Sequence, residues 1–180
     1  MADEPALAAA IFERAREGRR WTHNQVLTLT DGLRDEQVVW RPGPHAPSIG
    51  FHVWHLARWA DHDAHRFDGS PELWVSESLA AAWGFPGVLG EADSGTGMGD
   101  DASEMLVLPG KAALLEYARA AFASLDETAE RLAAGAMRVP GTGVADAVEV
   151  TITYATHDNR HLGMIEALRG LLGISGTATN

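Results

Sequence analysis

Apolar residues recur at three- and four-residue intervals along four long stretches of the chain, and this spacing predicts four long helices. The first covers about residues 6–30, where Leu7, Ile11, Trp21, Val26 and Leu29 recur. The second opens at Ser48, a favourable N-cap, and ends near Gly69. The third covers about residues 111–134 and has the clearest apolar face. A further turn or two is expected within residues 33–40.

The fourth stretch begins ambiguously, because residues 148–154 alternate between apolar and polar side chains as a strand does. Helical spacing continues for longer, through Val150, Tyr154, His157, His161 and Leu168. No partner strand is evident elsewhere, so we expect a helix from about residue 148 onward. A glycine inside this helix, Gly163, costs about 1 kcal/mol relative to alanine. Close approach of another helix would explain its presence.

A long connection separates the second and third helices. After a short helix expected within residues 71–83, six glycines fall between Gly84 and Gly99 and exclude regular structure there. A loop of this length in a compact domain is usually functional, disordered or a crossover. We expect a crossover that partly closes over the functional site, and a second loop around Pro140 and Gly141. The predicted fold is therefore all-α, a four-helix bundle with a long crossover between helices two and three, in a single domain spanning residues 1–180.

Composition narrows the function. The chain has 14 Lys and Arg against 25 Asp and Glu, a net charge of −11, which disfavours binding to nucleic acid. No window of about 18 apolar residues predicts a membrane span. The first 20 residues are acidic before they are basic, unlike an export signal. There is no cysteine, so disulfides and a protein thiol nucleophile are excluded. We expect a cytoplasmic protein.

His157 and His161 are four residues apart on a predicted helix, so both imidazoles share one face and can offer nitrogens to a single metal ion. Bundles build such sites from facing helices, and the histidine-rich second helix is the best source of a third ligand. On it, His55 and His62 share a face, and His52 is a reserve candidate. Four histidines are expected to be ordinary surface or partly buried residues: His23, His45, His62 and His65. The alternative is a hydrogen-bonded histidine core without metal.

Three ordered segments carry a family resemblance: VVWRPGPHAPSIGFHVWHLARW (38–59), WGFPGVLGEADSGTGMG (83–99) and HDNRHLGMIEALRGLLGISGTAT (157–179). Together they resemble the DinB/YfiT-like superfamily. The resemblance implies a metal-ligand triad of His55, His157 and His161, a divalent metal that is usually zinc or nickel, and frequently a homodimer. Characterised relatives are transferases and isomerases that use low-molecular-weight thiols such as mycothiol or bacillithiol.

Three neutral imidazoles leave a metal with an open position, at which it activates water or a thiol. Because the chain lacks cysteine, any thiol must arrive with a small-molecule cosubstrate. These features favour a metal-dependent S-transferase or hydrolase. The alternative is a non-catalytic, dimeric stress-response module that binds a metal or small ligand. No catalytic residue is assigned. Three acidic residues lie near the histidines in sequence without one emerging as the partner of an imidazole: Asp61, Asp158 and Glu166.

Overall fold

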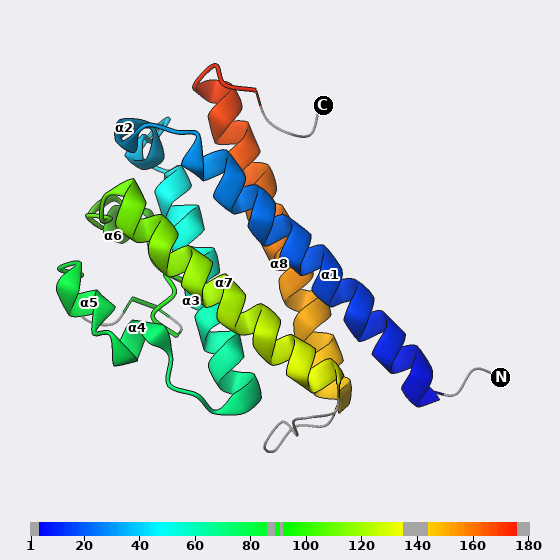
Figure 1. Cartoon of the computed structure of the whole chain (residues 1–180). Helices are drawn as coiled ribbons and strands as arrows, with labels where there is room; N and C mark the ends of the chain where they lie inside the picture. The colour runs from blue at the N-terminus through cyan, green and yellow to red at the C-terminus, as the bar shows by residue number, and fades with distance from the viewer. Residues whose placement is uncertain (1–3, 86–88, 91, 135–143, 176–180) are drawn as a thin grey trace.

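The computed structural model describes residues 4–85, 89–90, 92–134 and 144–175. All regular elements within these ranges are helices, and the four long ones form a bundle, which confirms the predicted fold class (Figure 1). The long helices are α1 (Glu4–Asp31), α3 (Ile49–Asp68), α7 (Lys111–Ala133) and α8 (Val144–Leu171). The short helix α2 (Asp35–Val39) precedes α3. Three more short helices lie in the crossover from α3 to α7: α4 (Leu73–Ser76), α5 (Leu79–Ala82) and α6 (Asp100–Glu104).

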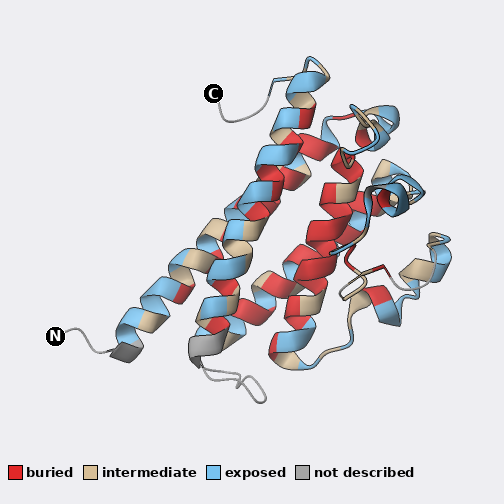
Figure 2. Cartoon of the chain, turned by 180° about the vertical axis from the view of Figure 1, so that it is seen from behind, coloured by how far each residue is buried: buried red, intermediate tan, exposed pale blue. Residues whose placement is uncertain are grey.

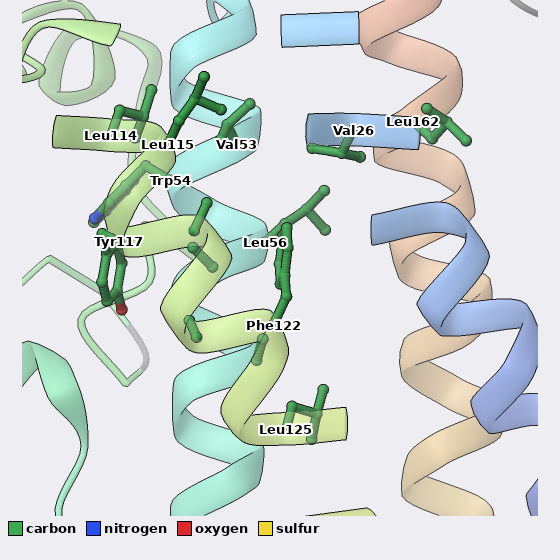
Figure 3. Packing of buried hydrophobic residues seen from close by; sticks show 14 of the residues in the cluster. Val26, Val53, Trp54, Leu56, Leu114, Leu115, Tyr117, Phe122, Leu125 and Leu162 are labelled. Carbon is green, nitrogen blue, oxygen red and sulfur yellow. The ribbon is translucent and has the colours of Figure 1, made fainter. Parts of the chain in front are cut away.

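The bundle consists of two closely packed helix pairs. α1 packs chiefly against α8, and α3 packs chiefly against α7. α3 is the most deeply buried of the four, as Figure 2 shows, with 15 of its 20 residues buried. The apolar core between the pairs is drawn in Figure 3 and includes Val26, Val53, Leu56, Leu114 and Leu162. Because α3 is central, polar side chains on it lie inside the protein and need partners.

The predicted ends of α3 are confirmed. Ser48 caps its first turn, since the Ser48 Oγ accepts a hydrogen bond from the Phe51 backbone N–H at 3.1 Å. Gly69 ends the helix in the left-handed conformation, with a φ of 73°. α8 begins at Val144, somewhat earlier than predicted, and the strand reading of residues 148–154 is wrong. The expectation for Gly163 is also wrong, because this residue is exposed and an added Cβ would meet nothing within 4 Å. The loop predicted around Pro140 lies outside the described residues.

The buried face of α1 differs from the face that its apolar spacing indicates. Leu7 and Trp21 are 54% and 56% exposed, whereas Arg19 and His23 are buried. A hydrophobicity pattern cannot register a charged side chain that is buried because its partners are on other helices. The exposed apolar residues of α1 therefore contribute little to the core of the single chain. The interior of the bundle beside α1 is more polar than the sequence suggests.

The crossover is fastened to α3 by Arg58, which is only 1% exposed. Its guanidinium donates to the carbonyl of Ala92 at 2.7 Å and to that of Asp93 at 3.2 Å. It also donates to Asp61 on α3, at 3.0 Å. Gly95 follows with a φ of 86°, and a Cβ there would lie 2.8 Å from the Trp54 ring, so only glycine fits without a shift. The loop therefore lies directly against the central helix.

No helix in the described ranges is both long enough and apolar enough to cross a bilayer.

Candidate metal centre

Three histidines meet where α3 faces α8. His55 comes from α3, and His157 and His161 come from successive turns of α8. Each can offer one ring nitrogen, and these three nitrogens lie within 4.8 Å of one another. His55 and His161 are buried, and the His157 side chain is 17% exposed. The structure thus brings together the three residues that the family resemblance selected, although their role as metal ligands stays a prediction.

The hydrogen bonds of two of these rings fix their tautomers. His55 Nδ1 lies 2.7 Å from the backbone carbonyl oxygen of Ser94, which can only accept, so Nδ1 carries the proton. His157 Nδ1 lies 2.9 Å from Oδ1 of Asp158. Burial alone would raise the pKa of Asp158, but Arg19, His157 and His23 lower it well below the usual value of a carboxyl. Asp158 is therefore ionised and accepts the proton of His157 Nδ1.

These tautomers leave a lone pair on each Nε2, and the two Nε2 atoms of His55 and His157 are only 3.0 Å apart. Two lone pairs at this distance repel unless a cation lies near both. Burial lowers the pKa of His55 to about 4, so this ring does not carry a second proton at neutral pH. Nitrogens bound to one tetrahedral zinc lie roughly 3.3 Å apart, given metal–nitrogen distances of about 2.05 Å. The donor set thus fits a divalent metal.

His161 has a partner of its own. Its Nδ1 lies 2.9 Å from Nδ1 of His52, a buried residue on α3, so one ring donates and the other accepts. When His161 donates, its Nε2 holds the lone pair that a third ligand requires. Burial, followed by the neighbouring histidines, lowers the pKa of His161 to about 2, and burial lowers that of His52 to about 4. Both rings are neutral at pH 7, as metal binding demands.

Asp158 connects the histidine cluster to a buried polar network. Its Oδ2 accepts from Arg19 Nε at 2.7 Å and from His23 Nε2 at 2.9 Å. Arg19 Nη1 in turn lies 2.8 Å from Oδ2 of Asp63 on α3. Asp63 and Asp158 have no exposed side-chain surface, and that of Arg19 is 4% exposed. One carboxylate on α8 therefore joins α1, α3 and α8 and orients a candidate metal ligand.

Some of these roles are not evident from the sequence. Asp158 follows His157 directly, and a step of about 100° per residue places adjacent side chains on different faces. The carboxylate reaches back to the ring beside it because Arg19 and His23 hold its other oxygen. His23, expected to be ordinary, is buried and belongs to this network. The four-residue spacing of Arg19 and His23 on a helix was the available signal.

Other sequence candidates lie away from the cluster. His62, expected to be an ordinary residue, pairs with Glu72 at 2.9 Å. Asp61 accepts from the backbone N–H groups of Leu73 and Trp74, both at 2.8 Å, and so anchors the start of the crossover. His52, expected as a reserve ligand, hydrogen-bonds to His161 in the structure. Its role there is to orient the ring of a candidate ligand.

Aromatic side chains surround the cluster. The Phe51 ring is parallel to that of His55, with centroids 6.0 Å apart. Tyr154 packs edge-on against His157 at 5.7 Å, and Trp59 packs against Tyr154 at 5.0 Å. The Trp59 Nε1–H donates to the hydroxyl of Thr96 in the crossover at 3.1 Å. Apolar walls with few polar groups are typical of sites that bind small organic molecules.

Comparison with known proteins gives one family. No curated protein matches the chain at a significant level. The family model of the DinB superfamily matches residues 20–165. This range contains α3, α7, the crossover and all three clustered histidines. Because the match extends over most of the chain and over all the elements that build the cluster, the protein belongs to the DinB superfamily.

Proposed function

We propose that this protein binds a divalent metal through His55, His157 and His161 and is a metal-dependent enzyme of the thiol S-transferase or hydrolase type. The observation that carries the proposal is the pair of Nε2 atoms 3.0 Å apart, on two rings whose Nδ1 protons are already assigned. A third histidine nitrogen lies within 4.8 Å of both. Convergent ring nitrogens in a buried site favour the binding of a cation.

A divalent metal with three imidazole ligands keeps an open position and lowers the pKa of a coordinating water or thiol to near neutrality. The chain's own residues prepare the ligands. Ser94 and Asp158 hold protons on the outer nitrogens of His55 and His157, so the inner nitrogens stay available. Phe51 and Tyr154 flank these rings and would contact the organic part of a substrate. Because the chain has no cysteine, a thiol would be a cosubstrate. Zinc and nickel are the metals that we propose.

Elemental analysis of protein purified without a histidine tag tests the metal proposal. We expect about one zinc or nickel per chain, and loss of that metal in His157→Ala and His161→Ala. His62→Ala is the matched control, since this histidine is on α3 but pairs with Glu72. Metal-free wild-type protein that does not take up zinc or nickel, or unchanged metal in the first two variants, refutes the ligand assignment.

The enzymatic proposal needs a separate assay. The metal-loaded protein is screened with mycothiol, bacillithiol and glutathione against electrophiles, and with esters against water. Turnover that His157→Ala abolishes supports the proposal. Turnover no higher than that of metal-free protein, across all thiols and esters, refutes it.

One observation favours the non-catalytic alternative, a protein that sequesters its metal. His55 and His161 are only 6% and 8% exposed. Under this alternative a chelator removes the metal slowly and no thiol perturbs the spectrum of a cobalt-substituted site. A rapid spectral change on adding a thiol favours the enzyme.

We also propose a homodimer that uses the outer face of α1 and α8. Ile11 on α1 and Ile152 on α8 line the same shallow surface depression and are 40% and 43% exposed. Leu7, one turn before Ile11, is 54% exposed. Light scattering should give twice the mass of the chain, and Ile152→Glu should shift it toward the monomer. A monomeric wild-type protein contradicts this proposal.

A further inference from the structure

A cavity of about 270 Å³ lies on the opposite side of Asp158 from the histidine cluster, where α1 faces α7. α1 packs less closely on α7 than on α8, which leaves this space between the helices. Its polar walls come from four arginines and a histidine: Arg16, Arg19, Arg20, Arg119 and His23. Its apolar walls include Leu27, Phe122 and Leu125, of which the last two are labelled on α7 in Figure 3. None of the three clustered histidines lines it.

The charge around this cavity contrasts with the rest of the molecule. The chain carries a net charge of −11, yet Asp126 is the sole carboxyl among the residues found to line the cavity. Two of the arginines are held firmly. Arg16 bonds to Glu13 at 2.7 Å and to Asp126 at 3.1 Å, and Arg19 belongs to the Asp158 network. These two guanidinium groups are fixed in the cavity wall, and each is already balanced by carboxylates.

The other two arginines are loosely held. Arg20 is 3.5 Å from Asp126, and Arg119 is 3.3 Å from Asp31, and the two arginine side chains are 48% and 53% exposed. Exposed ion pairs of this kind contribute about 0–1 kcal/mol. An incoming anion can therefore replace Asp126 and Asp31 as the partners of these arginines at little cost in free energy. It then accepts charge-assisted hydrogen bonds from the two guanidinium groups.

An aromatic wall indicates what else an occupant should carry. The His23 ring stacks on Phe122, with centroids 3.9 Å apart and planes within 9°, and offers a flat wall. A cavity of about 150 Å³ holds a benzene ring, so this one has room for a ring and a carboxylate.

We propose that the cavity between α1 and α7 binds a small aromatic monocarboxylate. Its carboxylate lies among Arg20 and Arg119, and its ring packs along the wall formed by Phe122 and His23. The site is separate from the candidate metal ligands, because its lining residues include none of them; Arg19 and His23, which line it, also bond to Asp158.

Calorimetric titration of the full, metal-loaded chain with phenylacetate tests the proposal, with phenylacetamide as the neutral probe of the same shape. We expect phenylacetate to bind and the amide to bind at least about tenfold more weakly, since a hydrogen bond to a charged group contributes about 1.5–3 kcal/mol. Arg20→Gln and Arg119→Gln should each weaken phenylacetate binding by roughly tenfold. Arg14→Gln is the matched control, because Arg14 is an α1 arginine outside the cavity.

The alternatives give different results. Equal affinity for acid and amide shows an apolar cavity without anion recognition and overturns the proposal. The same loss in Arg14→Gln shows a general charge effect and overturns it as well. Carboxylates also bind metals, so phenylacetate is titrated into metal-free His157→Ala. Retained binding supports the proposal, and lost binding assigns the acid to the metal and refutes it. Absence of binding at millimolar phenylacetate also refutes it.

Discussion

Replacing Asp158 with asparagine tests whether the buried network supports the histidine cluster. The carboxylate accepts three hydrogen bonds, from His157 Nδ1, Arg19 Nε and His23 Nε2, at 2.9, 2.7 and 2.9 Å. An asparagine side chain has nearly the same shape but only one acceptor atom. If its amide nitrogen faces Arg19 and His23, those two donors lose their acceptor. If the amide nitrogen faces His157, it donates to Nδ1 of that ring. The ring proton then moves to Nε2, the nitrogen proposed to bind the metal.

The structure sets the magnitude of both effects. Asp158 is fully buried and Arg19 nearly so, which means that solvent does not screen the lost charge. Removing one partner of a buried ion pair costs about 3–5 kcal/mol. Arg19 keeps its contact with Asp63, which places the expected loss in the free energy of unfolding near the lower end, about 3 kcal/mol. Replacing the carboxylate that orients a metal-binding histidine typically weakens metal affinity by about 10–100-fold.

Urea denaturation of the metal-free protein measures the first effect, and competition with a chelating dye measures the second. Asp68→Asn is the control, because Asp68, at the end of α3, also pairs with an arginine, Arg131, at 2.7 Å, but lies outside the Asp158 network. We expect that control to change stability by less than about 1 kcal/mol and leave metal affinity intact. Equal behaviour of Asp158→Asn and Asp68→Asn in both assays would refute the role given to the network.

Three further results are expected. Metal-free protein should lose stability as pH falls from 6.5 to 4. The pKa values of buried His52 and His55 are about 4, so both residues take up protons in the unfolded chain before they do so in the folded one. Each contributes about 3 kcal/mol to the free energy of unfolding over that range, and a urea midpoint that does not change with pH contradicts this. Gly95→Ala should displace the crossover, because the added Cβ would lie 2.8 Å from Trp54, and it should change both the tryptophan fluorescence and the melting temperature. Gly97 has a similar φ, but an added Cβ there meets no atom within 4 Å, so Gly97→Ala should show only the cost of the backbone conformation. Chelation should leave the helical circular dichroism intact, because the Asp158 network needs no metal, but should lower the melting temperature; an unfolded apo protein contradicts this.

The sequence was sufficient for the parts of the fold that depend on local chemistry and on spacing. Ser48 and Gly69 identified the ends of α3 because caps act over a single turn. The apolar spacing of the third stretch identified α7 and most of the residues that it buries, although Thr128 and Ala129 are also buried and were not expected. His157 and His161 share a face by helical geometry alone, and the family resemblance added His55.

The rest depended on contacts between distant residues. Asp158 orients His157 because Arg19 and His23 lie 139 and 135 residues away in sequence but beside it in space. No periodicity encodes such a contact, and for the same reason the buried face of α1 was misjudged. The support of His55 by Ser94 depends on how Arg58 fastens the crossover, which a count of glycines cannot show. Local patterns and the family resemblance thus identified the candidate ligands, and long-range polar contacts determine which of their nitrogens are available.

The three charged residues at the centre of the bundle, Arg19, Asp63 and Asp158, come from three different helices and have almost no exposed surface. Losing Arg19 alone leaves two buried carboxylates without their cation, and losing Asp158 removes the strongest partner of Arg19, so a lineage that replaces these residues one at a time passes through a destabilised protein. Across the DinB superfamily these positions should therefore change together, either kept as a charged set or exchanged as a set for apolar side chains. Such covariation would record the history of the bundle independently of its metal or substrate.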